Sequence, residues 1–152
     1  VARGEIIVLA DADLGASIKE IEKLIKPVAG GKADMTIAAI PIIGGGLGLV
    51  TTLAHKGLQL ITGQNMKAPL SGQRAFKREI IKDILPLSPG FGLEIGMDLD
   101  LINNNYNFKE IECEIKHKTT GHSVSGYRHR GQQFLAIFLT LCRKSKTFSK
   151  LS

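Results

Sequence analysis

The sequence has 152 residues, of which 43% are hydrophobic and 22% are charged. This length predicts one domain with a sizeable buried core, and the composition excludes a disordered chain, a collagen-like fibre and a disulfide-rich secreted scaffold. The net charge is +6, with 20 Lys and Arg against 14 Asp and Glu. Such a modest excess suits an anionic ligand such as a phosphate and equally a plain basic surface.

Two further features bear on the compartment. Cys113 and Cys142 form neither a CxxC pair nor a metal-ligand spacing, so we expect two reduced thiols in a cytoplasmic protein. The start of the chain shows no signal-peptide pattern.

Residues 35–54 are uncharged and about as long as a membrane span. Pro41 and the glycines at 44–48 interrupt them, which predicts a strand, a glycine loop and a helix, with no transmembrane span.

The first half of the chain alternates strand and helix patterns. Residues 5–10 (EIIVLA) are apolar on both faces and predict a buried parallel strand. A capping-box pattern at 17–20 then precedes an apolar helical stripe that ends near Pro27. Residues 34–40 predict a second buried strand. Residues 47–61 repeat apolar side chains at helical spacing and are followed by Gly63, a plausible helix stop.

The second half of the chain also predicts both strands and helices. Residues 109–116 (KEIECEIK) alternate apolar and acidic side chains, which predicts a half-exposed strand at an edge of the sheet. The other expected elements are turns and a short strand at 67–77, a short helix at 78–85, a helix at 93–102, an apolar helix at 132–143 and a disordered basic tail at 144–152. Alternating strands and helices predict an α/β fold. Because the first strand reads as a central one and few strands follow it, we expect this chain to be the second part of a longer domain.

Asp11 and Asp13 follow the first expected strand directly. Ligands bind at the carboxyl ends of strands in open α/β sheets. Two carboxylates spaced i, i+2 in a loop can converge on one hard cation such as Mg²⁺ or Mn²⁺. The alternative is that one Asp caps a helix and the other is solvated, as is common in turns.

In several segments, including the one that contains these two aspartates, the sequence resembles family 2 glycosyltransferases of the GT-A fold. The run IIVLADADL at 6–14 is similar to their DxD segment, and other segments follow in the family's order over about residues 2–138. These segments are GGGLGLV at 44–50, LITG at 60–63, LSGQRAFK at 70–77, GFGLEIG at 90–96 and YRHR at 127–130. The last one is similar to a basic His-containing segment of the branch that includes glucosyl-3-phosphoglycerate and mannosyl-3-phosphoglycerate synthases.

The resemblance implies a fold and an activity. The fold is a GT-A-like (Rossmann-related) sheet with flanking helices, with residues 1–143 forming the C-terminal part of the catalytic domain and the N-terminal nucleotide-binding strands lacking. The activity is metal-dependent transfer of a glycosyl group from a nucleoside diphosphate sugar to an acceptor, with Mg²⁺ or Mn²⁺ as cofactor. We expect this chain alone to be inactive. The alternatives are a non-catalytic α/β module that binds phosphates or nucleic acid, and an inactive remnant that dimerises.

The resemblance also assigns roles to residues of the metal and diphosphate site. It makes Asp11, Asp13 and His129 metal ligands. The flanking Arg128 and Arg130 would pair with the leaving diphosphate, since a guanidinium can contact phosphate oxygens bidentately. The alternative for this basic segment is a solvated loop just before the final helix.

Further expected site residues come from the next two matching segments. Ser71, Gly72 and Gln73 are expected to bind substrate near the donor sugar and acceptor, although an ordinary turn gives the same pattern. Glu94 and Arg74 are the expected catalytic residues, with Arg74 holding an anionic acceptor and Glu94 contacting sugar hydroxyls. The alternative for Glu94 is a favourable place at a helix start.

Asp98 lies one helical turn after Glu94, and like charges at that spacing repel. We therefore expect sugar hydroxyls or a cation near this pair. As partners we expect a nucleotide-sugar donor and an acceptor, for which an anionic molecule is one candidate, and no nucleic acid. A homodimer is one of the assemblies that we consider. The protein would be cytoplasmic, with attachment to a membrane surface as a further possibility.

Overall fold

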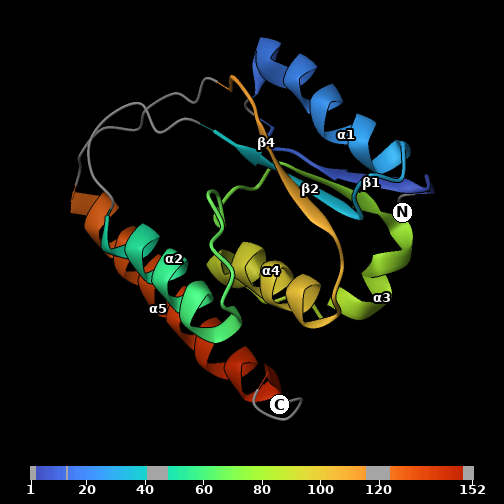
Figure 1. Ribbon diagram of the computed structural model, residues 1–152. Coiled ribbons are helices and arrows are strands. Elements are labelled where there is room, and N and C mark those ends of the chain that lie inside the picture. The colour runs from blue at the N-terminus through green and yellow to red at the C-terminus, as the bar shows by residue number, and fades with distance from the viewer. Residues whose placement is uncertain (1–2, 13, 41–47, 116–123, 149–152) are drawn as a thin grey trace.

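The computed structural model describes residues 3–12, 14–40, 48–115 and 124–148, with side chains left out at 16, 124–129 and 146–148. It confirms a mixed α/β architecture, with a sheet between helices (Figure 1). The strands are β1 (Ile6–Leu9), β2 (Met35–Ala39), β3 (Arg74–Lys77) and β4 (Phe108–Glu112). The helices are α1 (Ile21–Ala29), α2 (Leu49–Thr62), α3 (Ile81–Ile84), α4 (Leu93–Asn103) and α5 (Val124–Phe148), with 3₁₀ turns at Gly15–Glu20, Arg78–Ile80 and Gly90–Gly92.

The four described strands form one sheet in the order β1-β3-β2-β4. β3 runs antiparallel to both β1 and β2, while β2 and β4 are parallel. β1, β2 and β4 therefore share one direction, and their carboxyl ends meet the amino end of β3 at one edge of the sheet. Among the described strands β4 lies at an end of the sheet, which confirms the edge strand expected at 109–116.

The helices cover the two faces of the sheet unequally. α1 packs on one face, and α2, α4 and α5 lie on the other (Figure 1). β2 shows how the strands serve both layers. Met35 and Ile37 join the larger core with α2, α4 and α5, whereas Ala38 joins the core under α1. The alternation of side chains along a strand produces this division, and it confirms that β2 is buried on both faces.

One glycine of α2 allows it to pack closely on α5, and a second glycine ends the helix. Gly57 lies so close to α5 that a Cβ there would be 2.5 Å from Leu141 Cδ1. Gly63 ends α2 with a left-handed φ of 72°, and its N–H donates to the Gln59 carbonyl. The helix stop expected at Gly63 is thus confirmed. Among the described residues no helix is both long and apolar enough to cross a membrane.

Three expectations about the elements need correction. β1 is only half-buried and does not pair as a parallel strand. Its one partner among the described strands is β3, which runs antiparallel to it. The capping box does not start a helix, since α1 begins at Ile21 and the Glu20 carboxylate instead pairs with Lys23 and accepts the Glu114 N–H. The last helix extends beyond 132–143 in both directions. It includes the 127–130 segment expected as a loop and the first residues of the expected tail.

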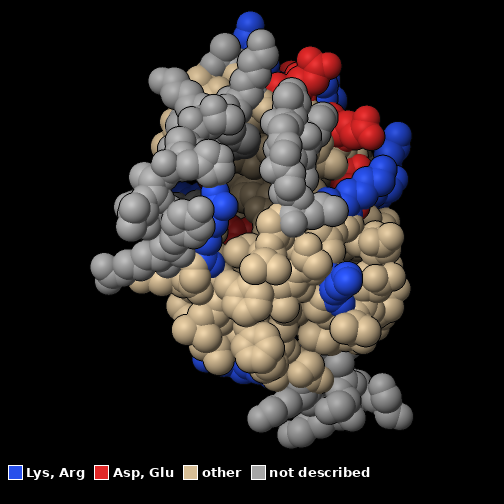
Figure 2. All heavy atoms as spheres, turned by 90° about the vertical axis from the view of Figure 1, so that its left-hand side faces the viewer, with Lys and Arg blue, Asp and Glu red and all other residues tan. Residues whose placement is uncertain are grey.

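The outer face of α5 is largely apolar. Ile137 and Leu141 are buried against α2 and α4, but other large apolar side chains of α5 and α2 remain exposed. They are Leu49, Leu60, Phe134, Leu135, Phe138 and Leu139. Figure 2 shows the lower part of this side of the molecule as a mostly uncharged surface. The core-packing role of the last helix therefore holds for one of its faces only.

Candidate functional site

The edge where the carboxyl ends of β1, β2 and β4 meet is the candidate site. Asp11 follows β1 by two residues at this edge, and residues 71–73 lead into β3 there. These ends lie at the left of Figure 1, and Figure 2 shows that side hollowed, with acidic and basic side chains around the hollow. Open α/β sheets bind ligands at this kind of edge, so the topology brings the first Asp of the DxD to the expected place.

The Asp11 carboxylate is held by the segment before β3. Gln73 Nε2 donates a hydrogen bond of 2.5 Å to Asp11 Oδ2, and Ser71 Oγ donates to Gln73 Oε1 at 3.3 Å. Gly72 lies so close that a Cβ on it would be 3.3 Å from Asp11 Oδ1. A side chain at this position would crowd the carboxylate. The structure thus brings Asp11, Ser71, Gly72 and Gln73 together.

Arg74, by contrast, is not free to hold an acceptor. Its guanidinium and the Asp98 carboxylate are both 0% exposed, and they pair through contacts of 2.5 and 3.3 Å. Arg74 Nε also donates to the Ser71 carbonyl at 2.8 Å, and Nη2 donates to the Pro69 carbonyl at 3.2 Å. The expected role in binding an anionic acceptor is corrected accordingly: Arg74 holds the protein's own 69–71 segment.

The ion pair of Arg74 and Asp98 also explains how Glu94 and Asp98 can lie one helical turn apart in spite of their like charges. Burial raises the pKa of Asp98 to about 6, against the opposing attraction and hydrogen bonding of Arg74, and the charges of Glu110 and Glu94 raise it further. The carboxyl is therefore mostly ionised at neutral pH. The cation expected beside these two acids is the guanidinium of Arg74. Glu94 itself is half-buried in the first turn of α4, where the helix dipole favours a carboxylate.

Glu110 supports the candidate site, and the sequence pattern did not indicate this role. Its place on β4 predicted an outward, solvated carboxylate. Its Oε2 accepts the Lys67 N–H at 2.9 Å, and its Oε1 accepts the Ala68 N–H at 2.6 Å. Glu110 thereby fixes the start of the segment that ends at Gln73. No local pattern indicates this contact, because the partners are 42 and 43 residues apart in the chain.

Most of the remaining expected ligands lie outside the described residues. Arg130 is exposed on α5. Asp13 and the side chains of Arg128 and His129 lie outside the described residues, as do glycines 44–46. Within the described ranges no cluster of three or more His, Cys, Asp or Glu side chains could hold a metal. The Asp11 carboxylate nevertheless supplies oxygen atoms of the kind that a hard cation prefers as ligands.

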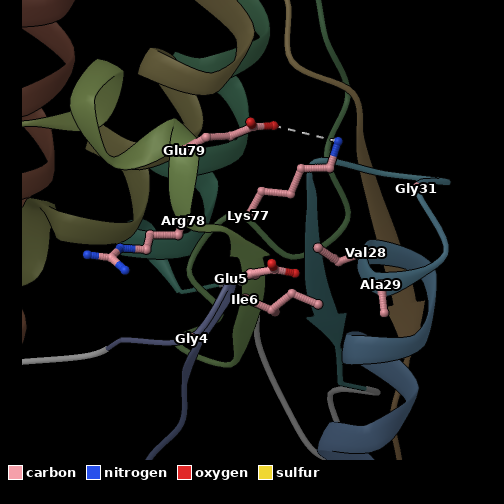
Figure 3. Close-up of a pocket in the computed structure, with 9 residues that line it drawn as sticks. All are labelled: Gly4, Glu5, Ile6, Val28, Ala29, Gly31, Lys77, Arg78 and Glu79. Atoms are coloured by element: carbon pink, nitrogen blue, oxygen red, sulfur yellow. Dashed lines mark ion pairs between the residues drawn. The ribbon is translucent and has the colours of Figure 1, made fainter.

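A separate cavity of about 680 Å³ lies at the opposite end of β1 (Figure 3). Its lining includes Glu5, Lys77 and Glu79, and Lys77 pairs with Glu79 at 3.8 Å and with Asp34 at 2.6 Å. The hydrogen bond to Asp34 raises the pKa of Lys77 and keeps it charged. None of the residues that the sequence singled out for chemistry lines this cavity.

Comparison with known proteins places the fold. No protein-family model and no curated protein matches the sequence. Among solved structures the chain resembles glucosyl-3-phosphoglycerate synthase from Mycobacterium tuberculosis in complex with phosphoglyceric acid, with a TM-score of 0.72 and 23% identity over 95% of this chain and 51% of that chain. The complex of that enzyme with Mn²⁺, UDP-glucose and phosphoglyceric acid gives 0.74 and 22% over 95% and 51%. The complex with Mg²⁺ and UDP gives 0.69 and 21% over 95% and 50%.

These values show a shared fold and how much of each chain has it. Nearly all of this chain superposes, while it spans about half the length of the solved structures that it matches. The α/β fold expected from the sequence is thus confirmed by solved structures of low sequence identity. This chain has the fold of the glucosyl-3-phosphoglycerate synthase glycosyltransferases over about half of their length.

Proposed function

We propose that this chain supplies the metal-binding and acceptor-side part of a glycosyltransferase that uses a nucleoside diphosphate sugar. The observation that carries the proposal is the Asp11 carboxylate at the carboxyl edge of the sheet, held by Gln73 and closely approached by Gly72. The fold adds support, because structural neighbours were solved with Mn²⁺, UDP-glucose and phosphoglyceric acid. In this proposal residues 1–143 belong to the catalytic domain.

Asp11 and Asp13, with His129, would hold a Mg²⁺ or Mn²⁺ ion. Such an ion supplies Lewis-acid stabilisation of the charge that develops on a leaving diphosphate. The chain's own part is to orient the Asp11 carboxylate, which the Gln73 amide does by donating to Oδ2. One oxygen of the carboxylate is then committed to Gln73, and Oδ1 faces the space beside Gly72.

The remaining proposed contacts concern the two substrates. Arg128 and Arg130 would pair with diphosphate oxygens and add preorganised positive charge. Glu94 would accept hydrogen bonds from sugar hydroxyls at the start of α4. The acceptor is proposed to be anionic, in keeping with the phosphoglyceric acid and glycerol 3-phosphate found in neighbour structures and with the net charge of +6.

The test is calorimetric titration with UDP, in the presence and absence of Mn²⁺, of a protein that joins this chain to a nucleotide-binding half, because the chain spans about half the length of its structural neighbours. We expect Mn²⁺-dependent binding that is lost in Asp11→Asn and in Asp13→Ala. The control is Glu22→Gln, which removes an exposed carboxylate on α1 that pairs with Lys26. Equal Mn²⁺-dependent affinity in folded Asp11→Asn and in the unchanged chain would refute the metal site.

The same titration separates the alternative function. A non-catalytic phosphate- or nucleic-acid-binding module would bind single-stranded nucleic acid or UDP without any need for Mn²⁺. We also propose that the 152-residue chain alone transfers no sugar at a useful rate, because it spans about half of its structural neighbours. Robust turnover from UDP-glucose would contradict that statement.

Partners and location complete the proposal. The two cysteines are free, Cys113 buried and Cys142 exposed, which agrees with the proposed cytoplasmic location. The proposed homodimer and the proposed attachment to a membrane surface would both use the exposed apolar face of α2 and α5. Neither helix contains Asp or Glu. Sedimentation analysis and flotation with anionic vesicles distinguish the two, since a dimer forms without lipid.

A further inference from the structure

We propose that Asp98 is a positioning residue, which acts through Arg74 to hold residues 69–73 against the Asp11 carboxylate. The inference goes beyond the proposed function, in which Asp98 has no part. Only its consequence for metal affinity rests on that proposed function. The arrangement of the segment itself can be measured without any metal.

The first step of the argument is the contact between α4 and β3. Both oxygens of Asp98 lie within hydrogen-bond reach of Arg74, at 2.5 and 3.3 Å, and both side chains are fully buried. A planar guanidinium bound by two carboxylate oxygens has one permitted orientation. Asp98 therefore fixes the plane of the Arg74 side chain.

The second step runs from that fixed plane to the chain before β3. Arg74 Nε donates to the Ser71 carbonyl and Nη2 donates to the Pro69 carbonyl. The backbone of Arg74 is itself fixed in the sheet opposite Leu9 of β1 and Ile37 of β2. A side chain anchored at its base and at its tip thus holds two carbonyl groups of the preceding turn.

The third step leads from the turn to Asp11. Leu9 pairs with Arg74 in antiparallel register, so continuing that register places Asp11 opposite Gly72. The distances agree with this placement: Gln73 Nε2 is 2.5 Å from Asp11 Oδ2, and a Cβ on Gly72 would be 3.3 Å from Oδ1. A shift of the turn would alter both contacts and free the carboxylate to rotate.

The pair is better explained by position than by stability. Burying two charges costs free energy that their attraction offsets only in part, and apolar residues of similar size often serve a fold equally well. A salt bridge is therefore an inefficient way to fill this part of the core. A bidentate pair with two further donors aimed at Ser71 and Pro69 is an effective way to fix a turn.

The experiment compares Asp98→Asn with Asp100→Asn at neutral pH. Asp100 lies on the same helix and also pairs with a cation, Lys144 of α5. Among the described residues its carboxylate makes no hydrogen bond or ion pair with residues 69–73. The first readout is amide hydrogen exchange, measured by NMR, at Ser71, whose N–H donates to the Ala68 carbonyl. We expect Asp98→Asn to speed this exchange about tenfold or more, and Asp100→Asn to leave it unchanged.

The second readout is Mn²⁺ affinity, measured by electron paramagnetic resonance of the free ion. Loss of an outer-shell partner typically weakens metal binding by about tenfold or more, so we expect that loss in Asp98→Asn only. If the unchanged chain binds no Mn²⁺, the metal site of the proposed function fails, and the exchange result still decides the positioning role. Equal Ser71 exchange in Asp98→Asn and in the unchanged chain overturns the inference.

A third variant separates position from folding. The double substitution Arg74→Met with Asp98→Leu keeps the buried volume and removes the hydrogen bonds to Ser71 and Pro69. We expect it to fold, as judged by circular dichroism, and to show the same fast exchange and weak Mn²⁺ binding as Asp98→Asn. A double variant that does not fold, or that folds with a protected turn, overturns the inference.

Discussion

The buried carboxyl of Asp98 makes the stability of this protein depend on pH in an unusual direction. Its pKa in the folded protein is about 6, against an ordinary value of 3.8, because burial disfavours the charge more than Arg74 favours it. As the pH rises, the unfolded chain loses this proton first. The stabilising contribution is therefore fully present below about pH 4 and is lost as the pH rises through about 6.

The size of the effect follows from the same shift. About two pKa units correspond to about 3 kcal/mol in the free energy of unfolding. That is a large share of the roughly 5–15 kcal/mol that stabilises a typical domain. Asp98→Asn cannot lose this proton, so the variant should lack the decline between about pH 4 and 6.

The assay is urea unfolding of both proteins at several pH values across this range. Other carboxyls contribute to each curve. Burial works to raise the pKa of Asp34, but hydrogen bonds from Lys77 and the Asn107 N–H outweigh it and lower that pKa. Such contributions are common to both proteins and cancel in the difference. A difference that stays flat, or in which the unchanged chain gains stability relative to the variant as pH rises, would refute the reasoning.

Three further substitutions test the packing by urea unfolding. Gly57→Ala should lose about 1–3 kcal/mol, because its Cβ would be 2.5 Å from Leu141 Cδ1; unchanged stability would show that α2 and α5 are less closely packed. Gly63→Ala should lose about 1 kcal/mol, because φ is 72°, and a gain would contradict the left-handed helix end. Lys144→Met should lose less than about 1 kcal/mol, since its pair with Asp100 is partly solvated.

The parts of the fold that the sequence predicted are those that depend on local patterns. The apolar run at 34–40 indicated β2, and the alternation at 109–116 indicated β4, because burial on two faces or one leaves a direct mark on the sequence. Gly63 marked the end of α2 for a similar reason, since a left-handed residue favours glycine. The start of α5 was missed because its first turns are basic and polar and show no apolar stripe.

The candidate site was predicted only where it consists of short local segments. Asp11 and residues 71–73 lie in short segments whose order resembles a known family, and the structure brings them together. The role of Arg74 was not predictable, because its partner Asp98 is 24 residues away and charged side chains are rarely fully buried. Glu110 was missed because an alternating strand indicates which face a side chain takes, not what it contacts there.

These contacts explain why the site depends on residues that are far from it in sequence. Asp11 is exposed at the end of a short, half-buried strand, so β1 alone does not restrain its carboxylate. The restraint comes from the turn before β3, which Glu110 of β4 fixes at its beginning and Asp98 of α4 fixes through Arg74 at its end. A metal ligand needs its orientation set by outer-shell partners. In the proposed metal site that function is divided between two acids on different elements, and the sequence indicated neither of the contacts through which they act.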